Sequence, residues 1–98
     1  MQTPISTILE QTISIAVSMG AKEIWLFGSY AHGTEKVGSD VDIAVDQCSN
    51  LNRLKRILNE NIRTLKTINP VLLPQKESLF RSEILNGKKI YDKDSGIS

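Results

Sequence analysis

The sequence of 98 residues has only one cysteine, Cys48, and no apolar run that approaches the roughly 20 residues needed to cross a membrane as a helix. A lone cysteine excludes an internal disulfide, and small domains without disulfides are typical of a reducing compartment. The first residues also lack the basic and apolar segments of a secretory signal peptide. Together these absences predict a cytoplasmic protein.

The sequence also has little net charge and little length. Twelve basic and eleven acidic residues leave a formal charge of +1, so there is no general basic field that would favour duplex nucleic acid as a partner. With 40% apolar and 23% charged residues the composition is that of a globular protein. Its length suits one modest core and is too short for two. We therefore predict one domain over residues 1–92, followed by a frayed polar tail over residues 93–98.

Hydrophobic periodicity predicts helices that alternate with short strands. The predicted elements are a helix from Pro4 to Met19, strands at 23–27 and 40–45, a helix at 51–65, a strand at 68–73, a helix at about 77–86 and a short strand at 88–91. Residues 28–39 are expected to form a loop with at most one helical turn. This order predicts an α/β (α+β) fold in which helices pack on a small mixed sheet of three to four strands.

The ends of these elements carry recognisable signals. Thr3 is expected to cap the first helix with Pro4 at its first position, and Gly20 to end it. Either Ser49 or Asn50 can cap the second long helix. The last predicted helix is expected to stop at Gly87. Two prolines in and after the strand at 68–73 remove backbone donors, which indicates a strand at the edge of the sheet.

Asp40 and Asp42 lie two positions apart in a predicted strand, so both point to one face while Val41 points to the other. Aspartate is depleted in strands, and two neighbouring carboxylates repel each other unless a cation lies between them. Mg²⁺ prefers such a supply of one or two carboxylates together with phosphate oxygens. The alternative is that the pair simply lines a solvated face of the strand.

Gly28 and Ser29 follow the apolar strand at 23–27, at the kind of strand end where α/β sheets place a ligand crevice. Glycine lets a phosphate approach the backbone closely, and the serine hydroxyl can donate to a phosphate oxygen. Taken alone, the pair is equally consistent with an ordinary turn. Ten residues separate Ser29 from Asp40.

The segment Leu26-Phe27-Gly28-Ser29-Tyr30-Ala31-His32-Gly33, followed by Ser39-Asp40-Val41-Asp42, resembles the signature of the DNA polymerase β-like nucleotidyltransferase superfamily. It is most similar to the minimal nucleotidyltransferase (MNT) branch, and within it to MntA-like antitoxins. The resemblance covers nearly the whole chain, because members of this branch contain little beyond the core fold.

The resemblance implies a role for each motif residue. Gly28 and Ser29 would bind the phosphates of a nucleoside triphosphate such as ATP, while Asp40 and Asp42 would be the catalytic residues and bind Mg²⁺. The reaction would transfer a nucleoside monophosphate, by resemblance AMP, to a hydroxyl group. His32 stands where the branch commonly has arginine, so it either donates to a phosphate without the forked guanidinium or is a solvated loop residue. Ser39 either orients the first aspartate or caps the turn.

One expected carboxylate is missing from the sequence. Active relatives usually carry a third acid on the third strand, but residues 67–74 contain none, and Asn69 is nearest to the expected position. A neutral amide is a poor base and a weaker metal ligand. Asp46 shares the face of the two aspartates but is expected roughly 13 Å beyond Asp42 along the strand. Glu35 lies on the loop and is a geometric alternative.

Three hypotheses follow. The protein is an active nucleotidyltransferase with a compensated site, a nucleotide-binding or partner-binding module without turnover, or a structural domain. By resemblance, MNT proteins often pair as antitoxins with a small helical HEPN-type ribonuclease toxin, and some transfer AMP to a tyrosine of that toxin. Two aromatic residues are left open: Tyr30 packs against a base or against the sheet, and Trp25 lies in the core or at the wall of a cleft.

Overall fold

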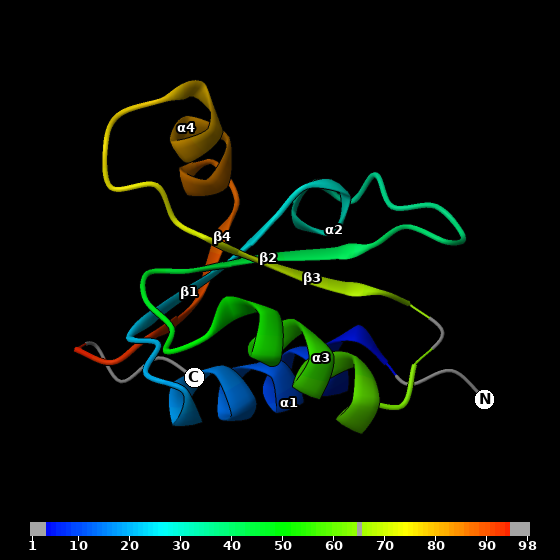
Figure 1. Ribbon diagram of the computed structural model, residues 1–98. Helices are drawn as coiled ribbons and strands as arrows, with labels where there is room; N and C mark the ends of the chain where they lie inside the picture. The colour runs from blue at the N-terminus through cyan, green and yellow to red at the C-terminus, as the bar shows by residue number, and fades with distance from the viewer. Residues whose placement is uncertain (1–3, 65, 95–98) are drawn as a thin grey trace.

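The computed structural model describes residues 4–64 and 66–94. Their helices and strands follow the predicted order. The elements are α1 (Ile5–Ser18), β1 (Glu23–Phe27), α2 (Ser29–His32), β2 (Val41–Val45), α3 (Leu51–Asn61), β3 (Ile68–Leu72), α4 (Leu79–Leu85) and β4 (Lys88–Asp92). The expected single helical turn in the loop is therefore α2, and the short last strand is β4 (Figure 1).

The four strands form one mixed sheet in the order β3-β2-β1-β4. β1 pairs antiparallel with both β2 and β4, whereas β2 and β3 run parallel. The predicted small mixed sheet is confirmed, and so is the edge position of the strand that contains Pro70. An edge is where a strand tolerates proline, because one side of its backbone has no ladder to complete.

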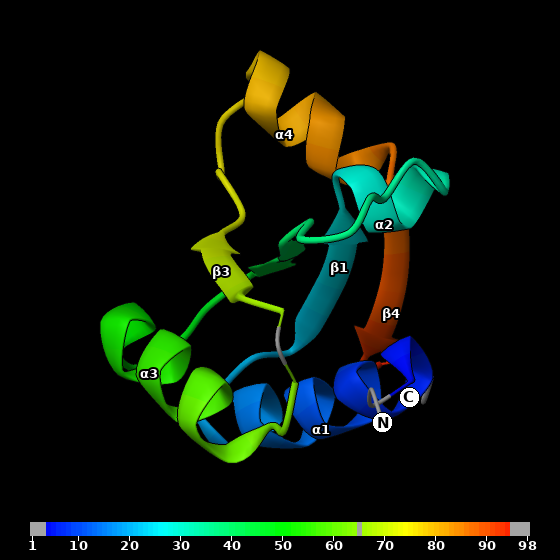
Figure 2. The ribbon, with the colours of Figure 1, turned by 90° about the vertical axis from the view of Figure 1, so that its right-hand side faces the viewer.

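Helices α1 and α3 cover one face of the sheet, and α4 lies on the opposite side (Figures 1 and 2). Val41, Ile43 and Val45 are fully buried and belong to the larger core cluster, which also takes up side chains of α1 and α3. Phe27, Ala44 and Ile84 form a smaller cluster on the side of α4. The alternation along β2 thus separates an apolar face from the face that carries Asp42.

Two helix boundaries differ from the prediction. Pro4 is the N-cap residue of α1 and not its first helical residue, and it makes no side-chain capping bond. Thr3, the predicted cap, lies outside the described residues. α3 ends at Asn61 because Ile62 turns into an extended conformation, with ψ of 120°, and remains buried against the core. Leu65, at the predicted end of this helix, also lies outside the described residues.

The remaining ends have clear local causes. Asn50, and not Ser49, caps α3, since its side chain accepts a hydrogen bond from the N–H of Arg53. α4 begins at Leu79, later than predicted, because Ser78 accepts from the N–H of Arg81. Gly87 follows α4, and a Cβ there would lie 2.2 Å from the carbonyl oxygen of Leu26. Glycine is therefore required at position 87, because the chain after α4 passes very close to the backbone of β1.

Of the predicted tail, Lys93 donates from its backbone N–H to the carbonyl of Lys22, and residues 95–98 lie outside the described part of the chain. Among the described helices, none is both long enough and apolar enough to cross a membrane.

Candidate active site

Gly28 is positioned by the register of two strands. Phe27, the last residue of β1, is the partner of Asp42 on the antiparallel strand β2, so the next residue of the chain lies directly beside Asp42. The backbone of Gly28 has φ of 75° and ψ of −153°, a region that is essentially restricted to glycine. A Cβ at this position would lie 2.5 Å from Oδ2 of Asp42. The chain thus needs glycine here both for its conformation and for the space that the carboxylate occupies.

Ser29 begins α2 immediately after this glycine. The N–H of Ala31 donates to the carbonyl of Gly28, and the N–H of Thr34 donates to the carbonyl of Ser29, which closes one compact turn above the end of β1. Ala31 is buried and fastens the turn to the core, and Gly33 ends it in a left-handed conformation. Ser29 therefore begins a hydrogen-bonded turn directly after the glycine that lies against Asp42.

Asp42 is a half-buried residue of β2, the strand that lies between β1 and β3. The parallel register pairs it with Asn69, whose side-chain amide donates to Oδ1 at 3.4 Å. Burial raises the pKa of the Asp42 carboxyl above its ordinary value, the hydrogen bond from Asn69 opposes this, and the charges of Asp40 and Glu83 raise it further. Asn69 is thus beside Asp42, at the position where a third carboxylate was expected.

Asp40 lies directly before β2, in an exposed position. Among residues 4–64 and 66–94, no lysine, arginine or histidine forms an ion pair with Asp40 or Asp42. A pair of carboxylates without a cationic partner matches the oxygen donors that Mg²⁺ prefers. The described residues contain no group of three acidic, histidine or cysteine side chains able to hold a metal by themselves. Phosphate oxygens and water would have to complete the coordination.

The loop residues have simpler surroundings. The hydroxyl of Ser39 accepts from the N–H of Lys36, and the N–H of Ser39 donates to the carbonyl of Lys36, so this serine caps the turn before Asp40. His32 is the last residue of α2 and is exposed. Glu35 is exposed on the same loop, and its charge is not among those that act on Asp42.

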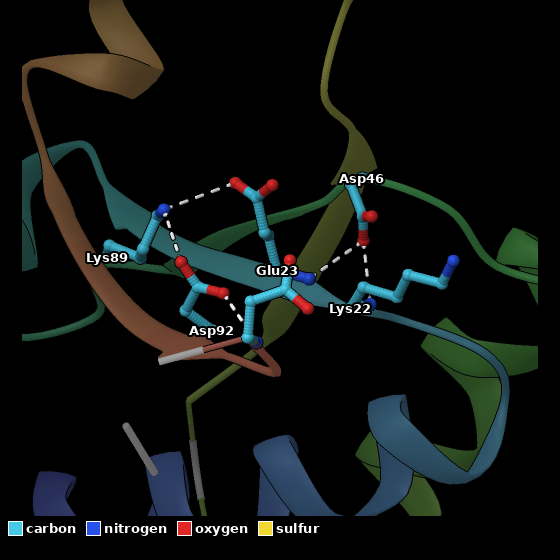
Figure 3. A network of polar contacts seen from close by, with 6 residues as sticks. Lys22, Glu23, Asp46, Lys89 and Asp92 are labelled. Carbon is cyan, nitrogen blue, oxygen red and sulfur yellow. Dashed lines mark hydrogen bonds and ion pairs between the residues drawn. The ribbon is translucent and has the colours of Figure 1, made fainter. Parts of the chain in front are cut away.

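Asp46 has a structural role at the opposite end of the sheet. One of its carboxylate oxygens accepts from the backbone N–H groups of Lys22 and Glu23, each at 2.9 Å, as Figure 3 shows. This carboxylate fixes the start of β1 and agrees with the expectation that it does not replace the third acid. The neighbouring network, in which Lys89 lies 2.8 Å from Asp92 and 3.4 Å from Glu23, is also visible in Figure 3.

Packing decides where the two aromatic residues Tyr30 and Trp25 lie, because each packs against a core cluster. Tyr30 is partly buried against the larger core cluster, with the Nζ of Lys66 at 5.9 Å from its ring centroid. Trp25 packs against the smaller cluster on the face of the sheet that also carries Asp42, and Lys89 lies 5.2 Å from its ring. Its indole Nε1 is buried and has no hydrogen-bond partner within the described residues.

Glu83 is a residue near the site that sequence reasoning missed. It belongs to α4, and its charge contributes to the raised pKa of Asp42. In the sequence it is one acidic residue of a short amphipathic segment, and nothing local indicates which strand that segment will cover. Only the packing of α4 against β1 brings it toward the aspartates.

Comparison with known proteins gives one match, to a family model. The family model described as "Polymerase beta, Nucleotidyltransferase" matches residues 7–96, which include the glycine-serine turn and both aspartates. No curated protein and no solved structure is significantly similar to the chain.

Proposed function

Because the chain belongs to the polymerase β nucleotidyltransferase family, we propose that it binds a nucleoside triphosphate with Mg²⁺ and transfers the nucleoside monophosphate, AMP from ATP, to a hydroxyl group. Family membership supports nucleotidyl transfer as the general reaction. In it, a bond forms between the acceptor oxygen and the α-phosphorus while the bond from the α-phosphorus to the bridging oxygen breaks. The acceptor hydroxyl loses its proton and pyrophosphate leaves.

The observation that carries this proposal is the contact between Gly28 and Asp42. The register of β1 and β2 sets a glycine-only turn against the carboxylate of Asp42, and Asp40 lies two residues earlier, directly before β2. A phosphate group bound at the Gly28-Ser29 turn would therefore lie close to this pair of acids. Neither acid has a cationic partner within the described residues, so a divalent cation would relieve their repulsion.

Each residue then has a defined task. Asp40 and Asp42 hold Mg²⁺, which when bound would neutralise charge at the phosphates. Gly28 lets the turn lie against the Asp42 carboxylate, and the Gly28-Ser29 turn binds the β- and γ-phosphates, with the Ser29 hydroxyl donating to a phosphate oxygen. His32, exposed at the end of α2, adds a donor on the solvent side of the phosphates. Ser39 stabilises the turn before Asp40, because its hydroxyl accepts a hydrogen bond from the backbone N–H of Lys36. Catalysis of this kind rests on positioning and electrostatics, which a small scaffold can supply.

The acceptor that we propose is a tyrosine hydroxyl on a small helical partner of HEPN type. The basis is the Gly28-to-His32 segment together with Ser39-Asp40-Val41-Asp42, which resembles the MNT branch and its MntA-like antitoxins. On this view the protein is a cytoplasmic antitoxin that silences its partner by adenylylation. Residues 1–92 would act as one catalytic domain.

A second function is favoured by one observation. Asn69, the register partner of Asp42, is an amide at the place where active relatives usually have a carboxylate. A site with one acid fewer would retain nucleotide and Mg²⁺ and lack turnover. The protein would then be a binding module that recognises its partner without modifying it.

The two functions are separated by one experiment. The protein, ATP labelled at the α-phosphate, Mg²⁺ and a small helical HEPN-type protein are incubated together, and label on that protein is measured. The double variant Asp40→Asn, Asp42→Asn is the matched control, and binding of ATP to both proteins is measured by calorimetry. We expect label with the wild type and none with the double variant.

ATP binding by the wild type without any label on the partner would favour the binding module. If neither ATP nor Mg²⁺ bound to the wild type, the proposed function would be wrong in both forms.

A further inference from the structure

We propose that the outer edge of β4 pairs with the same edge of a second copy of this chain, which gives a dimer with a continuous sheet. The two strands would run antiparallel about a twofold axis, as in a self-complementary interface. The inference concerns the edge of the sheet and does not depend on nucleotide binding. It rests on a difference between the two edge strands, β3 and β4.

The β3 edge is closed to further pairing. The side chain of Asn59 accepts a hydrogen bond from the N–H of Ile68 and donates one to its carbonyl, each at 2.9 Å. Alternate residues of a strand direct their backbone groups to the same side. Pro70 would therefore present its N–H at this edge, and proline has none. Such features protect an edge strand from association.

The β4 edge has no such protection. β4 contains neither proline nor glycine, and it is the last strand of the sheet. In the part of the chain that the structure describes, no side chain forms a hydrogen bond with the backbone of residues 88–91. Ile90 and Tyr91 pack against the larger core cluster and are only partly buried. An ordered strand with an open edge is a template for the addition of another strand.

An irregularity in β4 decides which of its side chains share a face. The register of β1 and β4 shifts after Ile24, which leaves Ile90 without a partner on β1. A regular strand would place residues three apart on opposite faces. Because of the bulge, Lys89 and Asp92 lie side by side on one face of the sheet, with the Lys89 Nζ 2.8 Å from the Asp92 carboxylate (Figure 3).

The charges on this face are self-complementary. If two copies of β4 pair antiparallel about an axis between Ile90 and Tyr91, Lys89 of each copy lies opposite Asp92 of the other. Both side chains are accessible at the edge, since 31% of Lys89 and 19% of Asp92 is exposed. Opposite charges on directly opposed residues stabilise paired strands, whereas like charges destabilise them. The ion pairs of the two copies would thus join into one network.

This complementarity is the reason to assign a second copy of the chain as the partner. A twofold antiparallel pair presents the same strand from both sides, so one Lys89-Asp92 pair satisfies another. β4 is already ordered by its pairing with β1, so its association costs little conformational entropy. The contact is a single short strand, and we therefore expect a weak, concentration-dependent dimer.

The test exchanges charges across the proposed contact in the full chain. Sedimentation velocity over a range of protein concentrations measures the dissociation constant of the dimer. We expect Lys89→Glu alone and Asp92→Lys alone each to weaken the dimer by at least about 10-fold, because two pairs of like charge replace two of opposite charge. An equimolar mixture of the two variants should dimerise within about 3-fold of the wild type, because the mixed dimer restores both crossed pairs.

Two further variants complete the design. The double variant Lys89→Glu, Asp92→Lys restores crossed pairs within one type of chain, and it should also dimerise. Lys76→Glu, at an exposed lysine in the loop before α4, controls for the change in net charge and should behave as the wild type does. Lys89 also lies 3.4 Å from Glu23 in its own chain, so circular dichroism checks that each variant is folded.

A wild type that stays monomeric at every accessible concentration would overturn the inference. A dimer that survives both single substitutions would do the same, because the copies would then associate through another surface. Loss of the dimer without recovery in the mixture would reject the crossed pairs, and where a single variant does not fold, the double variant decides in the same way. Recovery in the mixture supports the inference, because a second chain cannot restore an ion pair that acts only within the first.

Discussion

The backbone of Gly28 and the side chain of Asp42 fit against each other so closely that a single added methyl group would lie 2.5 Å from Oδ2 of the carboxylate. The contact crosses from the end of β1 to the start of β2, and it is the point where the glycine-serine turn and the strand that carries Asp42 meet. The closeness of this contact allows the effect of a substitution at Gly28 or at Asp42 to be predicted.

We expect Gly28→Ala to lower the free energy of unfolding by about 2–4 kcal/mol, because strained backbone and overpacking add. Gly33→Ala is the matched control: its φ is 71° and nothing lies within 4 Å of the added Cβ. It should cost only about 1–2 kcal/mol for the left-handed conformation. Urea unfolding followed by circular dichroism measures both. Equal losses in the two variants would show that the contact with Asp42 does not constrain the turn.

Asp42 should make stability depend on pH. Its folded pKa is raised above 3.8, mainly by burial, so the protonated carboxyl favours the folded state. This contribution is fully present below the unfolded pKa and is lost as the pH rises through the folded pKa. At pH 7 without metal, Asp42→Asn should therefore melt about 2–4 °C higher than the wild type, a modest gain because the group is partly solvated.

The difference should disappear near pH 3, where both side chains are neutral. Glu60→Gln, an exposed acid on α3 and on the far side of the sheet, controls for the general loss of one negative charge. A melting temperature that drops at pH 7 in Asp42→Asn would contradict the sign of this prediction.

Asn69→Asp would restore an acid on β3 beside Asp42. Without metal we expect the melting temperature to fall by about 2–5 °C, because a hydrogen-bond donor to Asp42 is replaced by a like charge. With Mg²⁺ the order should reverse, since three carboxylates bind the cation more tightly than two. Thermal melts without Mg²⁺ and with saturating Mg²⁺ measure both effects.

Asn69→Ala removes the donor without adding a charge and serves as the control. Mg²⁺ should not rescue its stability beyond the shift seen in the wild type. An Asn69→Asp protein that gains nothing from Mg²⁺ would indicate that β3 does not face the cation.

Asp46→Ala should destabilise the protein without changing the site. Its carboxylate satisfies the N–H groups of Lys22 and Glu23, and leaving these donors unpaired costs about 1–3 kcal/mol. Urea unfolding measures this loss. Mn²⁺ affinity, measured at a temperature where the variant is folded, should equal that of the wild type. Weaker Mn²⁺ binding would place Asp46 in the site and not at the start of β1.

The sequence by itself determined the elements and the motif. Alternating apolar residues along 41–45 specify a strand with one buried face, and the order of helices and strands specifies a small mixed sheet. Pro70 indicated the edge strand correctly, because its missing N–H is a local property. Local patterns at Gly28, Ser29, Asp40 and Asp42 also indicated the nucleotidyltransferase superfamily, and the family match confirms that superfamily.

Only the tertiary structure decided what surrounds that motif. The end of α3 differs from the prediction because Ile62 is buried in the core in an extended conformation, outside the helix. The neighbours of Asp42 depend on two strand registers, which bring Gly28 from the end of β1 and Asn69 from β3 beside it. These contacts join Asp42 to residues 14 and 27 positions away in the chain. Their proximity results from packing of the whole sheet, which no local pattern in the chain records.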